Sequence, residues 1–394
     1  MKILINDYCG HPFQFDLSKE LVKRGHKVLH MFTYASGGPK ANFNEKFHNV
    51  EVVDISMPIV KKQNFIKRWF QESNYGIKAI KVIERFQPKV VISANTPMAA
   101  QRKIVHFCNK ERIKFVFWLQ DIISIAVQSI LTRKLGPLGK IIGAVFKSIE
   151  RNILKRSDHI VTIADDFVVT ISDWGINKTK STVIPNWSPI EQIPVLPKVN
   201  TYSLKHNIDH KFVVLYSGTM GMKHNPHIIS EAAKNLQDNS DIIFVVITDG
   251  IGMDVLKKEK EALSLDNLLL LPFQSFEIFP QVLASGDVLL TILEEDAGMF
   301  SVPSKVWSGY CAGRTSLLVV PEENLAAKRT KEINAGIVLP NDQSNKLSEK
   351  ILYLKSNPSL CNIHGKNARD FAEAHFKIDK IADRFEAILN NLHE

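Results

Sequence analysis

The sequence predicts an α/β protein of two Rossmann-like, doubly wound domains that face a central cleft. Its 394 residues are many for one hydrophobic core and enough for two. Short runs of β-branched residues alternate with helical stretches, as in parallel sheets built from strand–helix–strand units. The alternation is interrupted by a Pro-rich polar connection from Pro185 to about Tyr202, which is typical of an interdomain linker.

Runs that fit the strand pattern occur on both sides of this connection. Before it they are 2–7, 26–32, 50–55, 89–95, 114–120, 159–164 and 181–186; after it they are 211–218, 241–250, 267–273, 287–293, 315–320 and 335–340. Between the first two strands, 15–25 is expected to be a helix, because Leu17, Leu21 and Val22 share one face and Gly25 can end it. Each set predicts one sheet, with ligands bound beyond the carboxyl ends of its strands.

Composition indicates a cytoplasmic globular enzyme, with 45% hydrophobic and 23% charged residues. The apolar runs fall short of the roughly 18 residues that a spanning helix needs. Within residues 1–7 the apolar run is only Ile3, Leu4 and Ile5, which is too short for the hydrophobic region of a signal peptide. The four cysteines are scattered, which fits a reducing compartment better than a disulfide framework or a zinc site.

Charge is distributed unevenly. Residues 1–190 carry 29 Lys and Arg against 15 Asp and Glu, a net charge of +14, whereas residues 191–394 carry a net charge of −5. The basic half predicts an anionic partner, which composition leaves open among lipid headgroups, pyrophosphate and nucleic acid. Two amphipathic basic stretches, 61–86 and 131–156, either lie on an anionic bilayer surface or pack against the core with solvated outer faces.

Two loops of the first half carry candidate catalytic residues. The loop 8–14, YCGHPFQ, follows the first strand and precedes a helix, a position that favours an anionic group. His11 in this loop is a candidate proton carrier or phosphate ligand, with a cap of the turn as the alternative. Asp121, after the fifth strand in WLQD, is a candidate acceptor of a proton or hydrogen bond, with a cap of the next helix as the alternative.

Two loops of the second half suit a diphosphate. In SGTMGMKHNPH, Gly218 permits a tight backbone turn and Lys223 supplies positive charge ahead of a helix that begins near residue 226. In SVPSK, the hydroxyls of Ser301 and Ser304 and the ammonium of Lys305 lie at a probable helix start. The alternative for SVPSK is an ordinary helix start with a solvated lysine.

Several nucleotide and metal signatures are absent from the sequence. It contains neither G-x-G-x-x-G nor G-x-x-x-x-G-K-[ST], which argues against a dinucleotide dehydrogenase and a P-loop enzyme. It also lacks a D-x-D pair that would hold a divalent ion on a sugar nucleotide. We therefore expect no metal and no cofactor, with lysines and helix N-termini neutralising the diphosphate.

These segments together resemble a known family over nearly the whole chain. The segments are GHPFQFDLSKELVKRGHKVLH, WLQD, VIPNW, YSGTMGMKHNP, SVPSKVWSGYCAGR and PEENLAAK. The sequence resembles the GT-B glycosyltransferases, specifically family 4 retaining enzymes of the bacterial surface-polysaccharide (O-antigen and capsule) type, which include N-acetyl-L-fucosamine transferases. The resemblance implies that 1–190 bind the acceptor, that 200–375 bind the nucleotide sugar, and that a helix in 376–394 crosses back onto the first domain.

The resemblance also implies roles for individual residues. Gly10 and His11 would approach the donor phosphates or the acceptor. Lys223 and Lys305 would grip the diphosphate, and Ser304 and Asn324 would help to hold the donor. The sequence departs from the family where many members carry two glutamates eight positions apart, since Phe300 and Ser308 occupy those positions.

The function expected from the resemblance is a retaining transfer from a UDP-sugar to a polyprenyl-diphosphate-linked glycan in cell-surface polysaccharide synthesis. The sugar would be an N-acetylated or deoxy hexose, and the enzyme would be peripheral on the anionic inner face of the plasma membrane, without a nucleic-acid partner. Two alternatives remain at this point: a sugar-nucleotide epimerase on the same scaffold, and a non-catalytic module that binds nucleic acid through its basic half.

Overall fold

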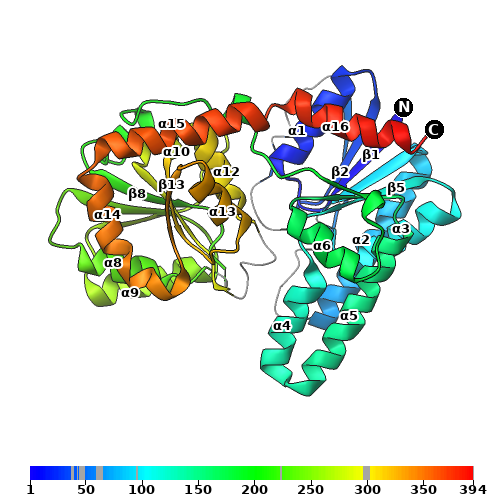
Figure 1. The fold of residues 1–394 in the computed structure, drawn as a ribbon, viewed down its shortest axis with the longest axis horizontal. Helices are drawn as coiled ribbons and strands as arrows, with labels where there is room; N and C mark the ends of the chain where they lie inside the picture. The colour runs from blue at the N-terminus through cyan, green and yellow to red at the C-terminus, as the bar shows by residue number, and fades with distance from the viewer. Residues whose placement is uncertain are drawn as a thin grey trace. The chain divides into compact units, whose positions relative to one another are not determined.

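A computed structural model of the chain describes residues 1–36, 40–41, 43, 49–58, 65–94, 96–221, 224–295 and 302–393. The chain divides into two compact units, Met1–Asn186 with Ile378–Glu394, and Trp187–Lys377. Each unit consists of one parallel sheet with helices packed on both faces (Figure 1). The predicted α/β class with two Rossmann-like sheets is confirmed.

The sheet of the first unit has seven parallel strands in the order β3-β2-β1-β4-β5-β6-β7. The strands are β1 Lys2–Asp7, β2 Lys27–Phe32, β3 Val50–Asp54, β4 Val90–Ala94, β5 Lys114–Leu119, β6 His159–Thr162 and β7 Ser181–Val183. Each lies within a run that the sequence predicted as a strand. The central strands could be predicted because helices on both faces bury them, which requires unbroken apolar runs.

The helices of the first unit are α1 Pro12–Lys23, α2 Phe65–Phe86, α3 Met98–Lys110, α4 Ile123–Leu135, α5 Pro137–Arg156, α6 Asp165–Asp173, the 3₁₀ helix η1 Lys178–Lys180 and α16 Ile378–Asn391. The helix expected at 15–25 is α1. It begins three residues earlier because Pro12 occupies its first turn, where the missing N–H of proline costs no helical hydrogen bond.

Helices α4 and α5 form a hairpin that extends beyond the sheet of the first unit (Figure 1). The basic stretch predicted at 131–156 is therefore not one element, because Gly136, with a φ of 56°, separates the two helices. The helices approach closely at Gly139, where an added Cβ would lie 2.0 Å from the carbonyl oxygen of Leu131. Only glycine fits at this crossing.

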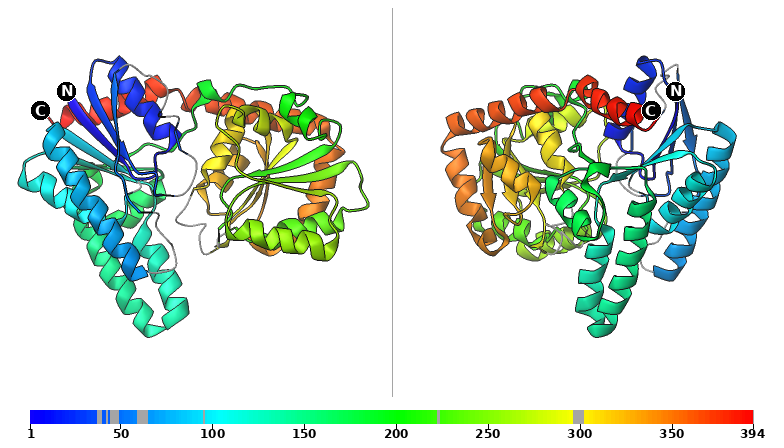
Figure 2. Two further views of the ribbon diagram at one scale, coloured as in Figure 1. Left: turned by 180° about the vertical axis from the view of Figure 1, so that it is seen from behind. Right: turned by 45° about the vertical axis from the view of Figure 1, so that its right-hand side comes forward.

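The C-terminal helix α16 packs against α1 within the first unit, as the two views of Figure 2 also show. Arg24 at the end of α1 donates from Nη1 to Asp383 Oδ1 at 2.7 Å and to Glu386 Oε2 at 2.6 Å. The buried ring of Phe385 meets Trp118 of β5 edge-on, with 4.9 Å between the centroids. Ion pairs at the rim and an aromatic contact in the core therefore both fasten α16.

The sheet of the second unit has six parallel strands in the order β10-β9-β8-β11-β12-β13. The strands are β8 Phe212–Ser217, β9 Ile242–Ile247, β10 Leu268–Leu271, β11 Val288–Ile292, β12 Thr315–Val319 and β13 Gly336–Leu339. All six lie within predicted runs. The order places the first strand of the unit in the middle of the sheet, as in the first unit.

The helices of the second unit are η2 Ile190–Gln192, α7 Thr201–Lys205, α8 His227–Asn235, α9 Ile251–Leu263, α10 Phe279–Ser285, α12 Ser304–Cys311, α13 Leu325–Glu332, η3 Asn341–Lys346, α14 Leu347–Lys355 and α15 Pro358–His375. Side chains from α8, α9 and α14 join those of the strands in one apolar core.

The Pro-rich connection is attached to the second unit rather than forming a loose linker. Arg314 Nη2 donates to Leu196 O at 2.8 Å, and Arg369 Nη1 donates to Ile193 O at 2.9 Å. Lys198 Nζ donates to Asp287 Oδ2 at 2.6 Å. Side chains of the second unit thus bind the backbone of this segment, and the boundary between the units falls at Asn186 and Trp187.

The described helices include none that combines the length and the apolar character needed to span a membrane.

Candidate functional site

The strand order reverses once in each sheet, between β1 and β4 in the first unit and between β8 and β11 in the second. At such a reversal the flanking connections run to opposite faces and leave a crevice beyond the strand ends, where ligands of doubly wound sheets bind. The loop with Gly10 and His11 follows β1, and the loop with Gly218 follows β8. Each predicted loop therefore lies at the reversal point of its own sheet.

In the second unit the structure brings together two of the predicted residues, Gly218 and Lys305. The ammonium of Lys305 lies 3.7 Å from the centroid of the Tyr216 ring, a cation–π contact. A Cβ added at Gly218 would lie 3.0 Å from Cε and 3.1 Å from Nζ of Lys305, and the φ of Gly218 is 141°. Residue 218 must therefore be glycine for the lysine to reach the end of β8.

Tyr216, which sequence reasoning missed, contacts both Lys305 and the loop that begins at Gly218. Its ring is fully buried and its hydroxyl donates to Thr219 O at 3.0 Å. Burial raises the pKa of the phenol far above its ordinary value, so the ring stays neutral. One side chain thus underlies the ammonium of Lys305 and holds the loop that begins at Gly218.

The other predicted residues of the second unit lie at helix starts or outside the described residues. Ser304 is the exposed first residue of α12, so the positive end of that helix dipole lies next to Lys305. Asn324 is buried and its Oδ1 accepts from Ala326 N at 2.9 Å, which makes it the N-cap of α13. Its role toward a donor stays a prediction.

Three further predicted positions, Lys223, Ser301 and Phe300, lie outside the described residues. Ser308, at the other glutamate position, has its Oγ 3.0 Å from Ser188 Oγ.

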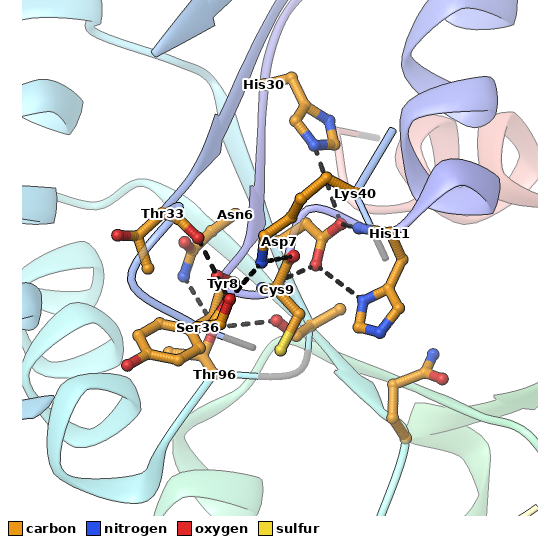
Figure 3. A network of polar contacts seen from close by, with 12 residues as sticks. Asn6, Asp7, Tyr8, Cys9, His11, His30, Thr33, Ser36, Lys40 and Thr96 are labelled. Atoms are coloured by element: carbon orange, nitrogen blue, oxygen red, sulfur yellow. Dashed lines mark hydrogen bonds and ion pairs between the residues drawn. The ribbon is translucent and has the colours of Figure 1, made fainter. Parts of the chain in front are cut away.

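In the first unit a buried carboxylate organises the loop after β1 (Figure 3). Asp7, at the end of β1, is fully buried. Its Oδ1 accepts from Cys9 N at 3.1 Å and its Oδ2 accepts from His11 N, while His11 Nδ1 lies 3.3 Å from Oδ1. Gly10 N donates to Asp7 O at 3.1 Å. His11 is the N-cap residue of α1, and its imidazole makes no capping hydrogen bond to that helix. Its role toward a ligand stays a prediction.

Lys40 and His30 lie around this loop (Figure 3). Lys40 Nζ donates to Cys9 O at 2.6 Å and to Ser36 O at 2.7 Å, and partial burial lowers its pKa. His30 is fully buried with Nδ1 2.8 Å from Ser18 Oγ. Burial lowers the pKa of His30 to about 4, so the ring is neutral at neutral pH.

Asp121 is exposed beyond the end of β5. The backbone N–H groups that open α4, those of Ile123 and Ser124, donate to the buried Glu150 of α5 at 3.1 and 3.0 Å. Burial raises the pKa of Glu150 to about 6. Glu150 thus caps α4 from the neighbouring helix α5. A cap of this helix was the alternative considered for Asp121. The catalytic role of Asp121 stays a prediction.

Among the residues that the structure describes, no three His, Cys, Asp or Glu side chains gather where a metal ion could bind. The expectation of metal independence stays a prediction.

Sequence comparisons relate part of the chain to known proteins. Residues 14–192 match the family model Glycosyltransferase Family 4. A putative colanic acid biosynthesis glycosyl transferase, WcaI of Escherichia coli (strain K12), is 27% identical over 172 residues, covering 43% of this chain and 42% of that protein. The alpha-D-kanosaminyltransferase of Streptomyces kanamyceticus is 24% identical over 191 residues, or 48% of each chain. The chain thus matches somewhat under half the length of these relatives.

Structural comparisons extend over both units. HepE of Anabaena in complex with UDP and glucose has a TM-score of 0.74 at 15% identity, with 99% of each chain covered. WaaG, a glycosyltransferase involved in lipopolysaccharide biosynthesis, has a TM-score of 0.70 at 15% identity, with 97% of this chain and 98% of that chain covered. At such identities the likeness establishes the fold alone. Residues 14–192 therefore match Glycosyltransferase Family 4, within a chain that has the GT-B fold.

Proposed function

We propose that the chain is a family 4 glycosyltransferase that takes its sugar from a nucleotide diphosphate donor, with UDP as the nucleotide. The observation that carries the proposal is the position of Lys305, whose ammonium lies beside Gly218 at the β8–β11 reversal point. Support comes from the family match of residues 14–192 and from HepE structures that contain UDP or UDP-glucose.

The chemistry follows from the charge that develops on the leaving group. The bond between the anomeric carbon and the diphosphate oxygen breaks, its electron pair stays on the diphosphate, and an acceptor oxygen bonds to the same carbon. Lys305 and the N-terminus of α12 provide fixed positive potential for the departing diphosphate. Attack on the face that the diphosphate leaves retains the anomeric configuration and needs no protein nucleophile.

The acceptor in this proposal is a polyprenyl-diphosphate-linked glycan of a cell-surface polysaccharide, and the sugar is an N-acetylated or deoxy hexose. The names of WcaI and WaaG, which refer to colanic acid and lipopolysaccharide biosynthesis, support this class of product. His11 and Asp121 are the proposed groups for the proton of the acceptor hydroxyl, since both lie beyond strand ends of the basic first unit.

A lipid-linked acceptor requires contact with the anionic inner face of the membrane, and the α4–α5 hairpin suits that contact. Leu135, Leu138 and Ile141 are 47%, 57% and 64% exposed, and the exposed Lys134 and Lys140 are their neighbours in the sequence. Exposed apolar side chains mixed with lysines are typical of segments that lie in the headgroup region of an anionic bilayer. We therefore assign peripheral membrane contact to this hairpin.

A donor screen tests the proposed reaction. UDP- and GDP-sugars are incubated with the protein and a synthetic polyprenyl-diphosphate-linked acceptor, and the products are identified by mass spectrometry. We expect a glycosylated lipid that requires both substrates and a UDP donor. Conversion of the sugar nucleotide without acceptor would instead identify an epimerase.

The Lys305→Ala variant tests the donor site. Loss of the ammonium should lower kcat by on the order of a hundredfold, because the charge acts mainly on the transition state. Lys366→Ala is the matched control, since Lys366 is exposed on α15 and pairs with Asp370. Equal turnover of the Lys305 and Lys366 variants would overturn the assignment of the donor site.

A further inference from the structure

The contact between Asp7 and His11 in the first unit resembles an acid–imidazole pair. In such a pair the acid hydrogen-bonds to one ring nitrogen, and the other nitrogen faces the substrate. We propose that Asp7 is a positioning residue that holds His11 as its Nδ1–H tautomer, so that Nε2 is the atom offered to substrate. The proposal rests on the proposed function in one respect, namely that the substrate is an acceptor hydroxyl.

The carboxylate of Asp7 receives three groups from the loop that it organises. Two are backbone N–H groups, of Cys9 and His11, and they fix where the backbone of His11 lies. The third is His11 Nδ1, 3.3 Å from Oδ1, and it fixes how the ring is turned. Both oxygens of the carboxylate act as acceptors for these N–H groups, so the ring nitrogen that faces them is the donor and carries the proton.

Two other basic side chains, His30 and Lys40, lie near Asp7, and their distances show which imidazole bonds to its carboxylate. The other imidazole near the carboxylate, His30, has its Nε2 3.9 Å from Asp7 Oδ2, beyond hydrogen-bonding distance. Lys40 has its ammonium on the carbonyl of Cys9 and on Ser36. Among the described contacts, His11 therefore makes the imidazole hydrogen bond to Asp7.

The side chain of His11 is accessible, whereas that of Asp7 is not. The exposed fractions are 31% for His11 and 0% for Asp7, and the second ring nitrogen lies away from the carboxylate (Figure 3). The pair thus consists of an inner acid that cannot reach a substrate and an outer base that can. A buried acid that orients a base in this way sets its tautomer and stabilises the imidazolium formed when it takes a proton.

The corresponding step in sugar transfer is balanced in atoms and charge. The acceptor oxygen bonds to the anomeric carbon, the bond from that carbon to the diphosphate breaks, and the hydroxyl proton moves to Nε2 of His11. The imidazolium then faces Asp7 through Nδ1–H. Without Asp7 the ring would turn freely, and the Nε2–H tautomer that predominates in free histidine would present a donor in place of the base.

Nitrogen-15 NMR of the histidine side chains tests the tautomer without reference to activity. The protein is labelled on histidine, and the His11→Gln variant identifies the signals of His11. We expect the Nδ1–H tautomer in the unaltered protein and a shift toward Nε2–H in Asp7→Asn. An Nε2–H tautomer of His11 in the unaltered protein would overturn the proposal.

A double-mutant cycle separates positioning from a purely structural effect. Asp7→Asn is expected to lower kcat by roughly 10- to 100-fold and KM little, because orientation of the base matters in the transition state. In a His11→Gln background the same change should lower kcat no further. If the two factors multiply instead, Asp7 acts independently of His11 and the proposal fails.

Asp158→Asn is the matched control, because Asp158 also accepts a backbone N–H, that of Phe115 at 2.9 Å. Phe115 lies near the amino end of β5, whereas Asp7 lies at the carboxyl end of β1 in the same sheet. This variant should lose stability and keep its kcat. Should Asp7→Asn not fold, Asp7→Glu replaces it: retention of Nδ1–H supports the proposal, and Nε2–H with unchanged kcat overturns it. If the unaltered protein transfers no sugar, the proposed function fails while the NMR result still decides the role of Asp7.

Discussion

His30 and Glu150 are buried titratable groups of the first unit, and both have shifted pKa values. The two shifts have opposite effects on how the stability of the fold depends on pH. Burial lowers the pKa of His30 from 6.5 to about 4 and raises that of Glu150 from 4.5 to about 6. Both shifts favour the neutral form in the folded state. Folding therefore gains from His30 at high pH and from Glu150 at low pH.

The His30→Asn variant isolates the first effect. The depressed pKa of His30 contributes stability that is complete above pH 6.5 and is lost as the pH falls toward 4, by about 3 kcal/mol for a shift from 6.5 to about 4. The variant should lack this loss. Urea unfolding of the full chain at pH 4 to 7 measures this loss of stability. If the free energy of unfolding of the variant and of the unaltered protein depends on pH in the same way, the pKa shift of His30 is contradicted.

Glu150→Gln isolates the second effect. Because the pKa of Glu150 is raised, its contribution is complete below pH 4.5 and is lost as the pH rises through 6, by about 2 kcal/mol. Glutamine keeps one acceptor for the N–H groups of Ile123 and Ser124, so α4 should still form. The same unfolding series should show a smaller decline between pH 4.5 and 6 in the variant.

Sequence reasoning predicted the loop residues of the candidate site and missed the residues beneath them. Gly218 and Lys305 could be recognised because they follow strands and precede helices, positions that the chain order reveals. Asp7, Tyr216 and Glu150 could not, because each matters through a partner that only packing brings near: the His11 loop, Lys305, and the first turn of α4.

At the level of elements, strands were predicted more reliably than helix ends. Strands buried on both faces must be apolar throughout, and this pattern is visible without knowledge of neighbours. The sequence predicts one amphipathic stretch at 131–156, whereas the structure divides it between α4 and α5. The break occurs at Gly136, with a φ of 56°, followed by Pro137 in the first turn of α5. The close approach of the two helices at Gly139 could not be predicted, because it involves Leu131 of the other helix.

The attachment of α16 gives a prediction at this level. Phe385 is fully buried and meets Trp118 edge-on, so Phe385→Ala should cost about 3 to 5 kcal/mol. Hydrogen exchange of the α16 amides measures the change locally, which avoids assuming that two units unfold together. Phe70→Ala is the control, since Phe70 is 68% exposed and its loss should change stability by less than about 0.5 kcal/mol.

At the level of the whole molecule, the basic part of the chain also carries the α4–α5 hairpin with its exposed apolar side chains. The chain has a net charge of +9, and its first 190 residues carry +14. The same part of the chain bears the hairpin with its exposed Leu138 and Ile141. A nucleic-acid partner would explain the charge but not the apolar side chains, whereas an anionic bilayer explains both.

Vesicle binding tests this interpretation with the full chain. We expect co-sedimentation with phosphatidylglycerol vesicles that weakens as salt screens the charges, and little binding to phosphatidylcholine vesicles. A Leu138→Ser, Ile141→Ser double variant should bind at least about tenfold more weakly, because each apolar side chain buried in the bilayer contributes over 1 kcal/mol. Ile363→Ser, at a half-exposed position of α15 in the second unit, should bind like the unaltered protein. Equal binding of all three proteins would show that charge alone holds the chain at the membrane and that the hairpin does not enter it.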